Sequence, residues 1–352
     1  MILLNPGPVN VSPRVTAALA RGDVCHREPE CAALMERIRS RLLEAFSPGG
    51  SFRAVLVSGS GTAAVEMAVA STLSPGGRLV VVANGVYGER MAAMAEAHRI
   101  AHTVVRGGWT EAPDLNRVEA AVRQPDVEAV AVVHHETTTG FLTRLAPIGE
   151  IARRHGKLLL VDAVSGLAGD ALDPDAVGAA LVAGTAGKCI QAFPGMVFVL
   201  VRADVLERLR AHPPRSVYLS LATYAGRAMP FTPAVQLAYA FDEALAELLE
   251  EGVAARIERY GAAARLLREG FARLGLACVL PQEHRSSTIT SLRMPIGRTY
   301  EVLHDALRAR GFVIYEGQGP LAREVFRVAN MGALARADFE RFLAALGEAL
   351  GR

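Results

Sequence analysis

Short apolar segments alternate with longer amphipathic ones over much of this chain of 352 residues. The apolar runs are rich in Val, Leu and Ala and short enough for buried strands, and helical periodicity lies between most of them. This alternation predicts a mostly parallel sheet covered by helices, in which ligands bind beyond the carboxyl ends of the strands. The predicted strands comprise residues 53–57, 79–83, 127–133, 158–161, 179–183 and 196–201.

The alternation gives way to long helical sequence after about residue 234. We therefore predict a large domain over residues 1–240 and a small α+β domain over residues 241–352, and we expect the N-terminal segment to reach the small domain. Candidate strands of the small domain comprise residues 287–292, 312–315 and 325–328. Its final helix has apolar side chains at spacings of three and four, which places them on one face. They are Phe339, Phe342, Leu343, Leu346 and Leu350.

Charge and composition disfavour several kinds of partner. The formal net charge is +2 and no basic run occurs, so we expect no nucleic-acid partner. The apolar runs are far shorter than the roughly 20 residues that cross a bilayer. Because the first residues also lack a cationic start, we expect no membrane partner, no secretory signal and a cytoplasmic location. The four cysteines lack the short paired spacing of a zinc site, and no metal is expected.

Of the 38 basic residues only Lys157 and Lys188 are lysines. A guanidinium cannot deprotonate to attack a carbonyl carbon, so a retained lysine indicates a place where the amine itself is needed. Lys188 lies in the loop 184–189, which has the sequence Gly-Thr-Ala-Gly-Lys-Cys. One interpretation is Schiff-base chemistry, and the other is an ordinary buried or surface charge.

Two predicted strands end in polar groups. Asp162 follows the apolar run 158–161, so its carboxylate is expected at the carboxyl edge of the sheet, partly removed from water. A protonated pyridine nitrogen would stabilise it there, and an arginine partner or a loop cap is the alternative. The segment 58–62, Ser-Gly-Ser-Gly-Thr, precedes a helical stretch and predicts either a phosphate cradle or a plain tight turn. It lacks the glycine pattern of a dinucleotide site.

Three further segments carry candidate ligands. Tyr87 follows a predicted strand, where its ring either stacks on a ligand or simply packs. The loop 134–140, His-His-Glu-Thr-Thr-Thr-Gly, matches no metal motif and offers either hydroxyl contacts to a ligand or turn chemistry. Arg327 interrupts an apolar strand of the small domain, which indicates a clamp for a carboxylate or phosphonate, or a structural salt bridge.

In this order and spacing, these segments resemble the class V aminotransferases, which use pyridoxal 5'-phosphate on the fold type I architecture. The resemblance covers nearly the whole chain and is strongest to the branch that uses 2-aminoethylphosphonate and pyruvate. It implies a homodimer with shared active sites and an α/β fold, with a large mixed, mostly parallel sheet and a smaller α+β C-terminal domain. The matching segments are 5–9, 25–28, 59–66, 84–88, 136–140, 161–163, Lys188, 231–233, 310–315 and 326–330.

The resemblance implies a role for each matching residue. Lys188 would hold the cofactor as a Schiff base and then carry the proton, while Asp162 would pair with the pyridine nitrogen. Tyr87 would stack on the ring and Thr137 would contact its edge. Arg327 would bind the carboxylate of alanine or pyruvate and, in the other half-reaction, the phosphonate. The phosphate of the cofactor would be held by Ser60, Gly61, Thr62 and, from the partner subunit, Thr232.

Departures from the family pattern flank this expected site. Gly187 stands where the family carries an amide, so a hydrogen bond near the phosphate is expected to be missing or supplied by Thr185. Cys189 follows the lysine, and His135 replaces an asparagine. An alanine- or serine-glyoxylate transaminase is therefore the main alternative. A cysteine desulfurase of the same class agrees less well, because its lysine usually follows a histidine and here Gly187 precedes it. A non-catalytic binding protein agrees poorly with the lysine, aspartate and arginine together. A nucleotide switch would instead bind ATP or GTP at the loop 59–62.

Overall fold

The computed structural model describes residues 1–225 and 229–352, and its largest feature is a seven-stranded sheet. The strand order is β2-β10-β9-β8-β5-β3-β4, and all neighbours are parallel except β10, which is antiparallel to both β2 and β9. This is the mixed, mostly parallel sheet that the sequence predicts. Its strands are β2 (Phe52–Gly59), β3 (Arg78–Ala83), β4 (Ala101–Arg106), β5 (Val127–Val133), β8 (Leu158–Asp162), β9 (Leu181–Thr185) and β10 (Gly195–Arg202).

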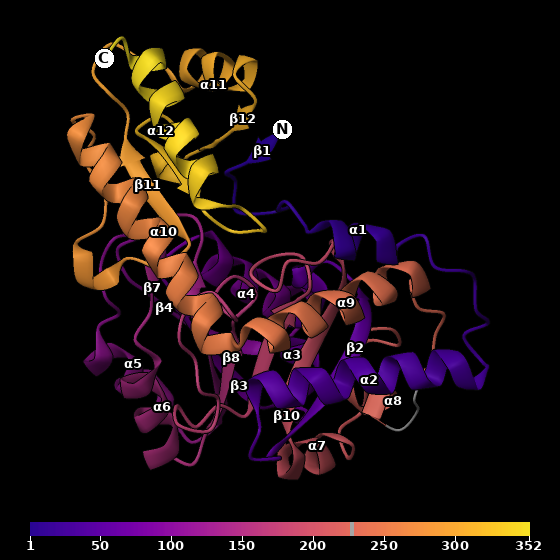
Figure 1. Cartoon of the computed structure of the whole chain (residues 1–352). Coiled ribbons are helices and arrows are strands. Elements are labelled where there is room, and N and C mark those ends of the chain that lie inside the picture. The colour runs from indigo at the N-terminus through magenta and orange to yellow at the C-terminus, as the bar shows by residue number, and fades with distance from the viewer. Residues whose placement is uncertain (226–228) are drawn as a thin grey trace.

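Helices cover both faces of this sheet (Figure 1). Alternate residues of a strand point to opposite faces, so Leu56 of β2 packs with one group of helices while Val57 packs with the other. The first group is α1 (Pro13–Ala18), α2 (Pro29–Phe46), α5 (Leu115–Val122), α6 (Leu145–Arg154) and α9 (Val235–Glu251). The second is α3 (Gly61–Thr72), α4 (Val86–Ala97), α7 (Ala203–Leu209) and α8 (Leu221–Ala225).

The edge strand β4 has no counterpart among the strands predicted from the sequence. Of its residues only Val105 is buried, and the others are partly or fully exposed, including His102 and Thr103. A strand at the edge of a sheet, whose faces are partly exposed to solvent, does not need a continuous apolar run. The pattern that identified the central strands is therefore absent from β4. The predicted strand 179–183 is β9, displaced by two residues toward the C-terminus.

The C-terminal part of the chain forms a smaller sheet in the order β11-β14-β13, which is antiparallel. The predicted strand 312–315 is divided between two pairings, because β12 joins β1 while β13 joins β14. The apolar face of α12 packs into the core of this part, as its periodicity predicts. The elements are α10 (Val253–Arg273), η1 (Gln282–His284), β11 (Ile289–Arg293), α11 (Tyr300–Ala309), β12 (Phe312–Val313), β13 (Tyr315–Glu316), η2 (Gly319–Leu321), β14 (Val325–Ala329) and α12 (Arg336–Leu350).

The N-terminal segment connects the two parts of the molecule (Figure 1). The strand β1 (Ile2–Leu3) pairs in parallel with β12, and the amide of Ala329 donates a hydrogen bond of 2.8 Å to the carbonyl of Leu4. The chain then passes to the large sheet and forms α1. The boundary expected between residues 240 and 241 falls inside the continuous helix α9, whose buried side chains, Phe241 among them, belong to the core of the large sheet.

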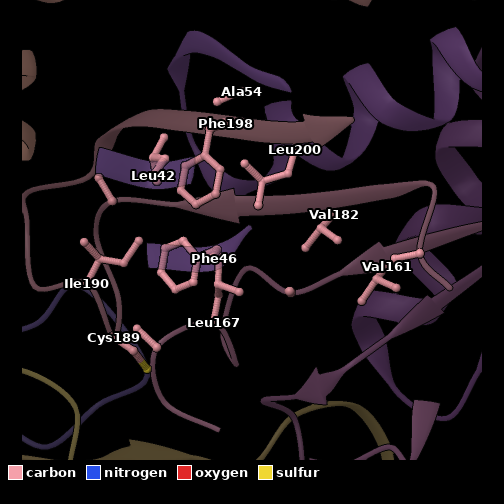
Figure 2. Close-up of a cluster of buried hydrophobic side chains, with 14 of the residues drawn as sticks. Leu42, Phe46, Ala54, Val161, Leu167, Val182, Cys189, Ile190, Phe198 and Leu200 are labelled. Carbon is pink, nitrogen blue, oxygen red and sulfur yellow. The ribbon is translucent and has the colours of Figure 1, made fainter. Parts of the chain in front are cut away.

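The core extends to the loop that carries Lys188. Figure 2 shows Cys189 and Ile190 in one apolar cluster with Leu42, Phe46 and Phe198, and the rings of the two phenylalanines stack with their centroids 6.5 Å apart. Close packing of this kind resists displacement, so the residues that follow the lysine are anchored in the interior. Over the two described ranges of the chain, no helix is both long and apolar enough to cross a membrane.

Candidate active site

Loops from several strands meet at one edge of the large sheet. The carboxyl ends of β3, β5, β8 and β9 lie at this edge because these strands are parallel, and β2 ends there too because β10 is antiparallel to both of its neighbours. A short hairpin, β6 (His135–Glu136) with β7 (Phe141–Leu142), follows β5. The topology thus collects the polar loops that the sequence marks as candidates, as expected for the ligand edge of an open α/β sheet.

Asp162 is the last residue of β8, where it is paired with Val133 of β5 and Ala183 of β9. One of its carboxylate oxygens accepts a hydrogen bond of 3.0 Å from the amide of Val164. Burial raises the pKa of the Asp162 carboxyl to about 6, and the negative charge of nearby Glu136 acts in the same direction. Within residues 1–225 and 229–352 it forms no salt bridge. A cation placed at this carboxylate would therefore be bound strongly.

Lys188 lies in the loop between β9 and β10, and its side chain is partly buried. Its Nζ donates a hydrogen bond to the backbone carbonyl of Pro6 from the N-terminal segment. Burial lowers the pKa of the Lys188 ammonium to about 8. A larger fraction of this amine is therefore neutral near pH 7 than of an ordinary lysine, and the neutral amine is the nucleophilic form.

The loop after β2 leads directly into the N-terminus of α3. Ser60 is the N-cap residue, yet its side chain makes no capping hydrogen bond. A Cβ atom at Gly61 would lie 2.6 Å from Cγ1 of Val164, so a larger residue does not fit there. The first turn of α3 therefore presents backbone N–H groups and the positive end of the helix dipole beside the strand edge, which suits a phosphate.

A small pocket of about 20 Å³ joins this loop to Asp162. Four of the residues predicted for the site line it together, namely Gly61, Thr62, Tyr87 and Asp162. The pocket is also lined by Arg90, whose guanidinium carbon lies 4.6 Å from the centroid of the Tyr87 ring and whose Nη1 donates to Thr62 Oγ1 at 3.2 Å. Sequence reasoning missed Arg90, although its spacing of three from Tyr87 on a helix could have indicated that the two side chains lie on one face.

The loop after β5 is organised by a buried carboxylate. Glu136 accepts hydrogen bonds of 3.1 Å from the amides of Tyr87 and Thr138, and also one from the Thr138 hydroxyl. The hydroxyl of Thr137 is buried and has no hydrogen-bond partner in the described part of the chain. An unpaired buried hydroxyl is costly, so Thr137 Oγ1 is available to a ligand, and Glu136 fixes the loop that presents it.

Arg327 reaches this loop from β14 of the smaller sheet. The side chain is only 2% exposed, and its Nη1 donates a hydrogen bond of 2.9 Å to the carbonyl of Thr137. Burial lowers the pKa of the Arg327 guanidinium. The structural salt bridge considered from the sequence is not formed, because no carboxylate of the described residues pairs with Arg327. A buried guanidinium without a counter-ion is suited to bind an anion.

Thr232 is not brought to this edge within one chain. It is exposed, and it lines a separate pocket together with Ser58, Tyr218 and Phe231. The resemblance assigns Thr232 to the phosphate site of a partner subunit. That role stays a prediction, because it concerns a contact between two chains.

The departures from the family pattern also have a structural setting. A Cβ atom at Gly187 would lie 2.9 Å from the backbone nitrogen of Pro194, so the loop before Lys188 has no room for an amide side chain. Thr185 Oγ1 lies 3.5 Å from the Gly187 amide, which donates to it. His135 is buried 3.8 Å from the carboxylate of Asp170, and burial lowers its pKa to about 3.

Comparisons with known proteins agree with this geometry. A model of the family "Aminotransferase class-V" matches residues 12–343. A 2-aminoethylphosphonate–pyruvate transaminase of Syntrophobacter fumaroxidans is 37% identical, over 100% of this chain and 96% of that protein. One from Vibrio cholerae is 35% identical over 99% and 97%. Among solved structures, an alanine–glyoxylate aminotransferase from Nostoc sp. has a TM-score of 0.93 at 30% identity, over 99% of this chain and 95% of that one.

The fold is that of the fold type I pyridoxal-phosphate transaminases. The chain belongs to the class-V aminotransferase family, and it is therefore a pyridoxal-phosphate-dependent transaminase. The residues present fit the cofactor that the family implies. Asp162 is a buried carboxylate without a cation, Thr137 Oγ1 is a buried hydroxyl without a partner, and the glycine at position 61 leaves the N-terminus of α3 open.

Proposed function

We propose that this enzyme transfers the amino group of 2-aminoethylphosphonate to pyruvate, forming phosphonoacetaldehyde and L-alanine by a ping-pong mechanism. The observation that carries the proposal is the guanidinium of Arg327. It is buried, has no acidic partner, and donates a hydrogen bond to the carbonyl of Thr137. Both substrates carry an anionic group at a short distance from the reacting carbon. One arginine can therefore bind them in turn, because a carboxylate and a phosphonate both accept two parallel hydrogen bonds.

The cofactor would be held by residues from three loops. Ser60, Gly61 and Thr62 would bind its phosphate, chiefly through the backbone N–H groups at the start of α3. Arg90 would keep the Thr62 hydroxyl oriented through its hydrogen bond of 3.2 Å to Thr62 Oγ1. Tyr87 would stack on the ring and Thr137 would contact its edge. When bound, pyridoxal phosphate supplies an electron sink that stabilises negative charge on the substrate carbon.

Two titratable groups of this chain would perform the rest of the chemistry. The Asp162 carboxylate would keep the ring nitrogen protonated, since its burial without another cation strengthens that pairing. Lys188 would attach the cofactor and then move a proton on and off the substrate carbon, and its lowered pKa of about 8 suits an amine that must act as a base. The N-terminal segment at Pro6 would help to keep water away from this amine.

We further propose that the enzyme is a homodimer with shared active sites, in which Thr232 of each chain completes the phosphate site of its partner. Thr232 is exposed in the single chain, as a residue that contacts a second chain must be.

An alanine–glyoxylate-type transaminase is the second candidate, favoured by the likeness to the Nostoc enzyme at 30% identity. The two candidates differ in the donor that the enzyme accepts. We expect purified enzyme with pyridoxal phosphate to form alanine from pyruvate when 2-aminoethylphosphonate is the donor, with a kcat/KM well above that for serine or alanine with glyoxylate. Activity with glyoxylate and none with the phosphonate would replace the first candidate by the second.

A further inference from the structure

The guanidinium of Arg327 is held by three neutral oxygen atoms. Its Nε donates to the carbonyl of Glu316 at 2.8 Å, and its Nη1 donates to the carbonyl of Thr137 at 2.9 Å and to the side-chain oxygen of Gln318 at 3.3 Å. In the part of the chain that the structure describes, Nη2 has no hydrogen-bond partner. Three of the five N–H groups are therefore in use, and two are free.

An anion binds arginine best through two parallel hydrogen bonds from two different nitrogens. The Nε position and one hydrogen of Nη1 are occupied by backbone carbonyls, which cannot move without the chain. The remaining bond of Nη1 goes to Gln318, and it is the longest of the three. A two-nitrogen fork of Nη1 and Nη2 is thus opened to an anion when the amide of Gln318 turns away, which a side chain can do without moving the backbone.

The backbone of Gln318 is fixed on both sides. The amide of Gly317 donates a hydrogen bond of 2.9 Å to the carbonyl of Val325, and a Cβ atom at Gly317 would lie 2.1 Å from the carbonyl oxygen of Leu321. A Cβ atom at Gly319 would lie 2.5 Å from the ring of Trp109, which belongs to the loop between β4 and α5. Gln318 is therefore held next to the anion site even when its bond to Arg327 is broken.

We propose that Gln318 is the residue that selects a phosphonate over a carboxylate, an inference that rests on the proposed function. A phosphonate has three oxygens on phosphorus: two take the fork of Arg327, and the third accepts a hydrogen bond from the displaced amide of Gln318. A carboxylate is planar: both of its oxygens lie in the fork and their remaining lone pairs stay in the plane of the guanidinium, so no oxygen projects out of that plane toward the displaced amide. Its binding breaks the bond between Gln318 and Arg327 without replacing it, so the carboxylate is bound more weakly.

The test compares two ligands that lack an amine and so cannot react, ethylphosphonate and propionate, on the enzyme with pyridoxal phosphate bound. Calorimetry gives both dissociation constants, and fluorescence of Trp109, the single tryptophan of the chain, reports the same binding through its contact with Gly319. We expect Gln318→Leu to weaken ethylphosphonate about tenfold or more, the scale of a hydrogen bond to a charged group, and to leave propionate unchanged or tighter.

Gln124→Leu is the matched control. Gln124 is exposed just after α5, and its side-chain amide donates only to the carbonyl of Ala120, which has no part in the proposed site. It should change neither constant. Equal weakening of both ligands by Gln318→Leu, or no effect on either, would overturn the assignment. The proposed function is judged separately: if wild-type enzyme still converts 2-aminoethylphosphonate, only the role of Gln318 is lost, whereas absence of that conversion removes the proposed function itself.

Discussion

Lys188 donates a hydrogen bond through Nζ to the backbone carbonyl of Pro6, a residue 182 positions earlier in the sequence. The segment that carries Pro6 begins at β1, which is bonded to β12 in the C-terminal part of the chain. A single short stretch of chain therefore connects the Lys188 amine with the part of the molecule that carries Arg327. This contact places the N-terminal segment at the proposed active site.

We predict that Gly7→Ala slows the attachment of pyridoxal phosphate to Lys188. Gly7 has a φ of +114°, which L-residues rarely adopt, and an added Cβ would lie 3.4 Å from Nζ of Lys188. The strain of about 1–3 kcal/mol should move this segment and its contact with the amine. The measurement is the rate at which borohydride traps the cofactor on the enzyme. Gly50→Ala, at a φ of +76° with no atom within 4 Å, should lose stability without this slower attachment.

Attachment of the cofactor should depend on pH with a midpoint near 8. Burial lowers the pKa of the Lys188 ammonium from 10.5 to about 8, and only the neutral amine attacks an aldehyde, so the rate rises with pH and levels off above the pKa. Stopped-flow mixing of apoenzyme with pyridoxal phosphate gives this profile. Lys157→Arg should leave it unchanged, and Lys188→Arg should abolish it. A rate that still climbs steeply at pH 10 would show that the amine is not shifted.

Much of this site could be predicted from the sequence because its residues are marked by local context. Lys188 is one of two lysines, and Asp162 ends an apolar run, so both were placed by patterns within a few residues. Gln318 carries no such mark, Arg90 is marked only by its spacing from Tyr87, and Pro6 is marked only by the matched segment 5–9. The contact of Pro6 with Lys188 joins residues 182 positions apart, which hydrophobic periodicity does not encode. The edge strand β4 was missed for a related reason, because its exposed side chains leave no apolar run.

Restoring the amide that the family pattern has before the lysine should destabilise this protein. In Gly187→Asn the new Cβ would lie 2.9 Å from the backbone of Pro194, which has no flexible end to move aside. Overpacking of this kind costs about 1–3 kcal/mol, so the melting temperature should fall by several degrees. Gly49→Asn, at a position with no neighbouring atom within 4 Å, is the control. An unchanged melting temperature for Gly187→Asn would mean that the loop adapts freely.

The buried histidine that replaces an asparagine should make the protein sensitive to acid. Burial lowers the pKa of His135 from 6.5 to about 3, so below pH 6.5 the unfolded chain takes up a proton that the folded chain does not. The free energy of unfolding therefore falls as the pH falls. At pH 5 the contribution of His135 to this loss is about 2 kcal/mol relative to neutral pH. Denaturant unfolding of His135→Asn should show a flatter decline between pH 7 and 5 than the wild type. His304→Asn, a control on α11, should decline with pH as the wild type does. If stability declines equally steeply with pH in all three proteins, His135 is not the source of the acid sensitivity.

The central claim is tested most directly by one half-reaction. Purified enzyme with pyridoxal phosphate bound is mixed with 2-aminoethylphosphonate in the absence of pyruvate, and the visible absorbance of the cofactor and the released aldehyde are followed together. We predict loss of the visible band with about one phosphonoacetaldehyde formed per active site, and its return on addition of pyruvate with an equal amount of alanine. A band that does not change with the phosphonate, but is lost with alanine or serine, would contradict the proposed substrate.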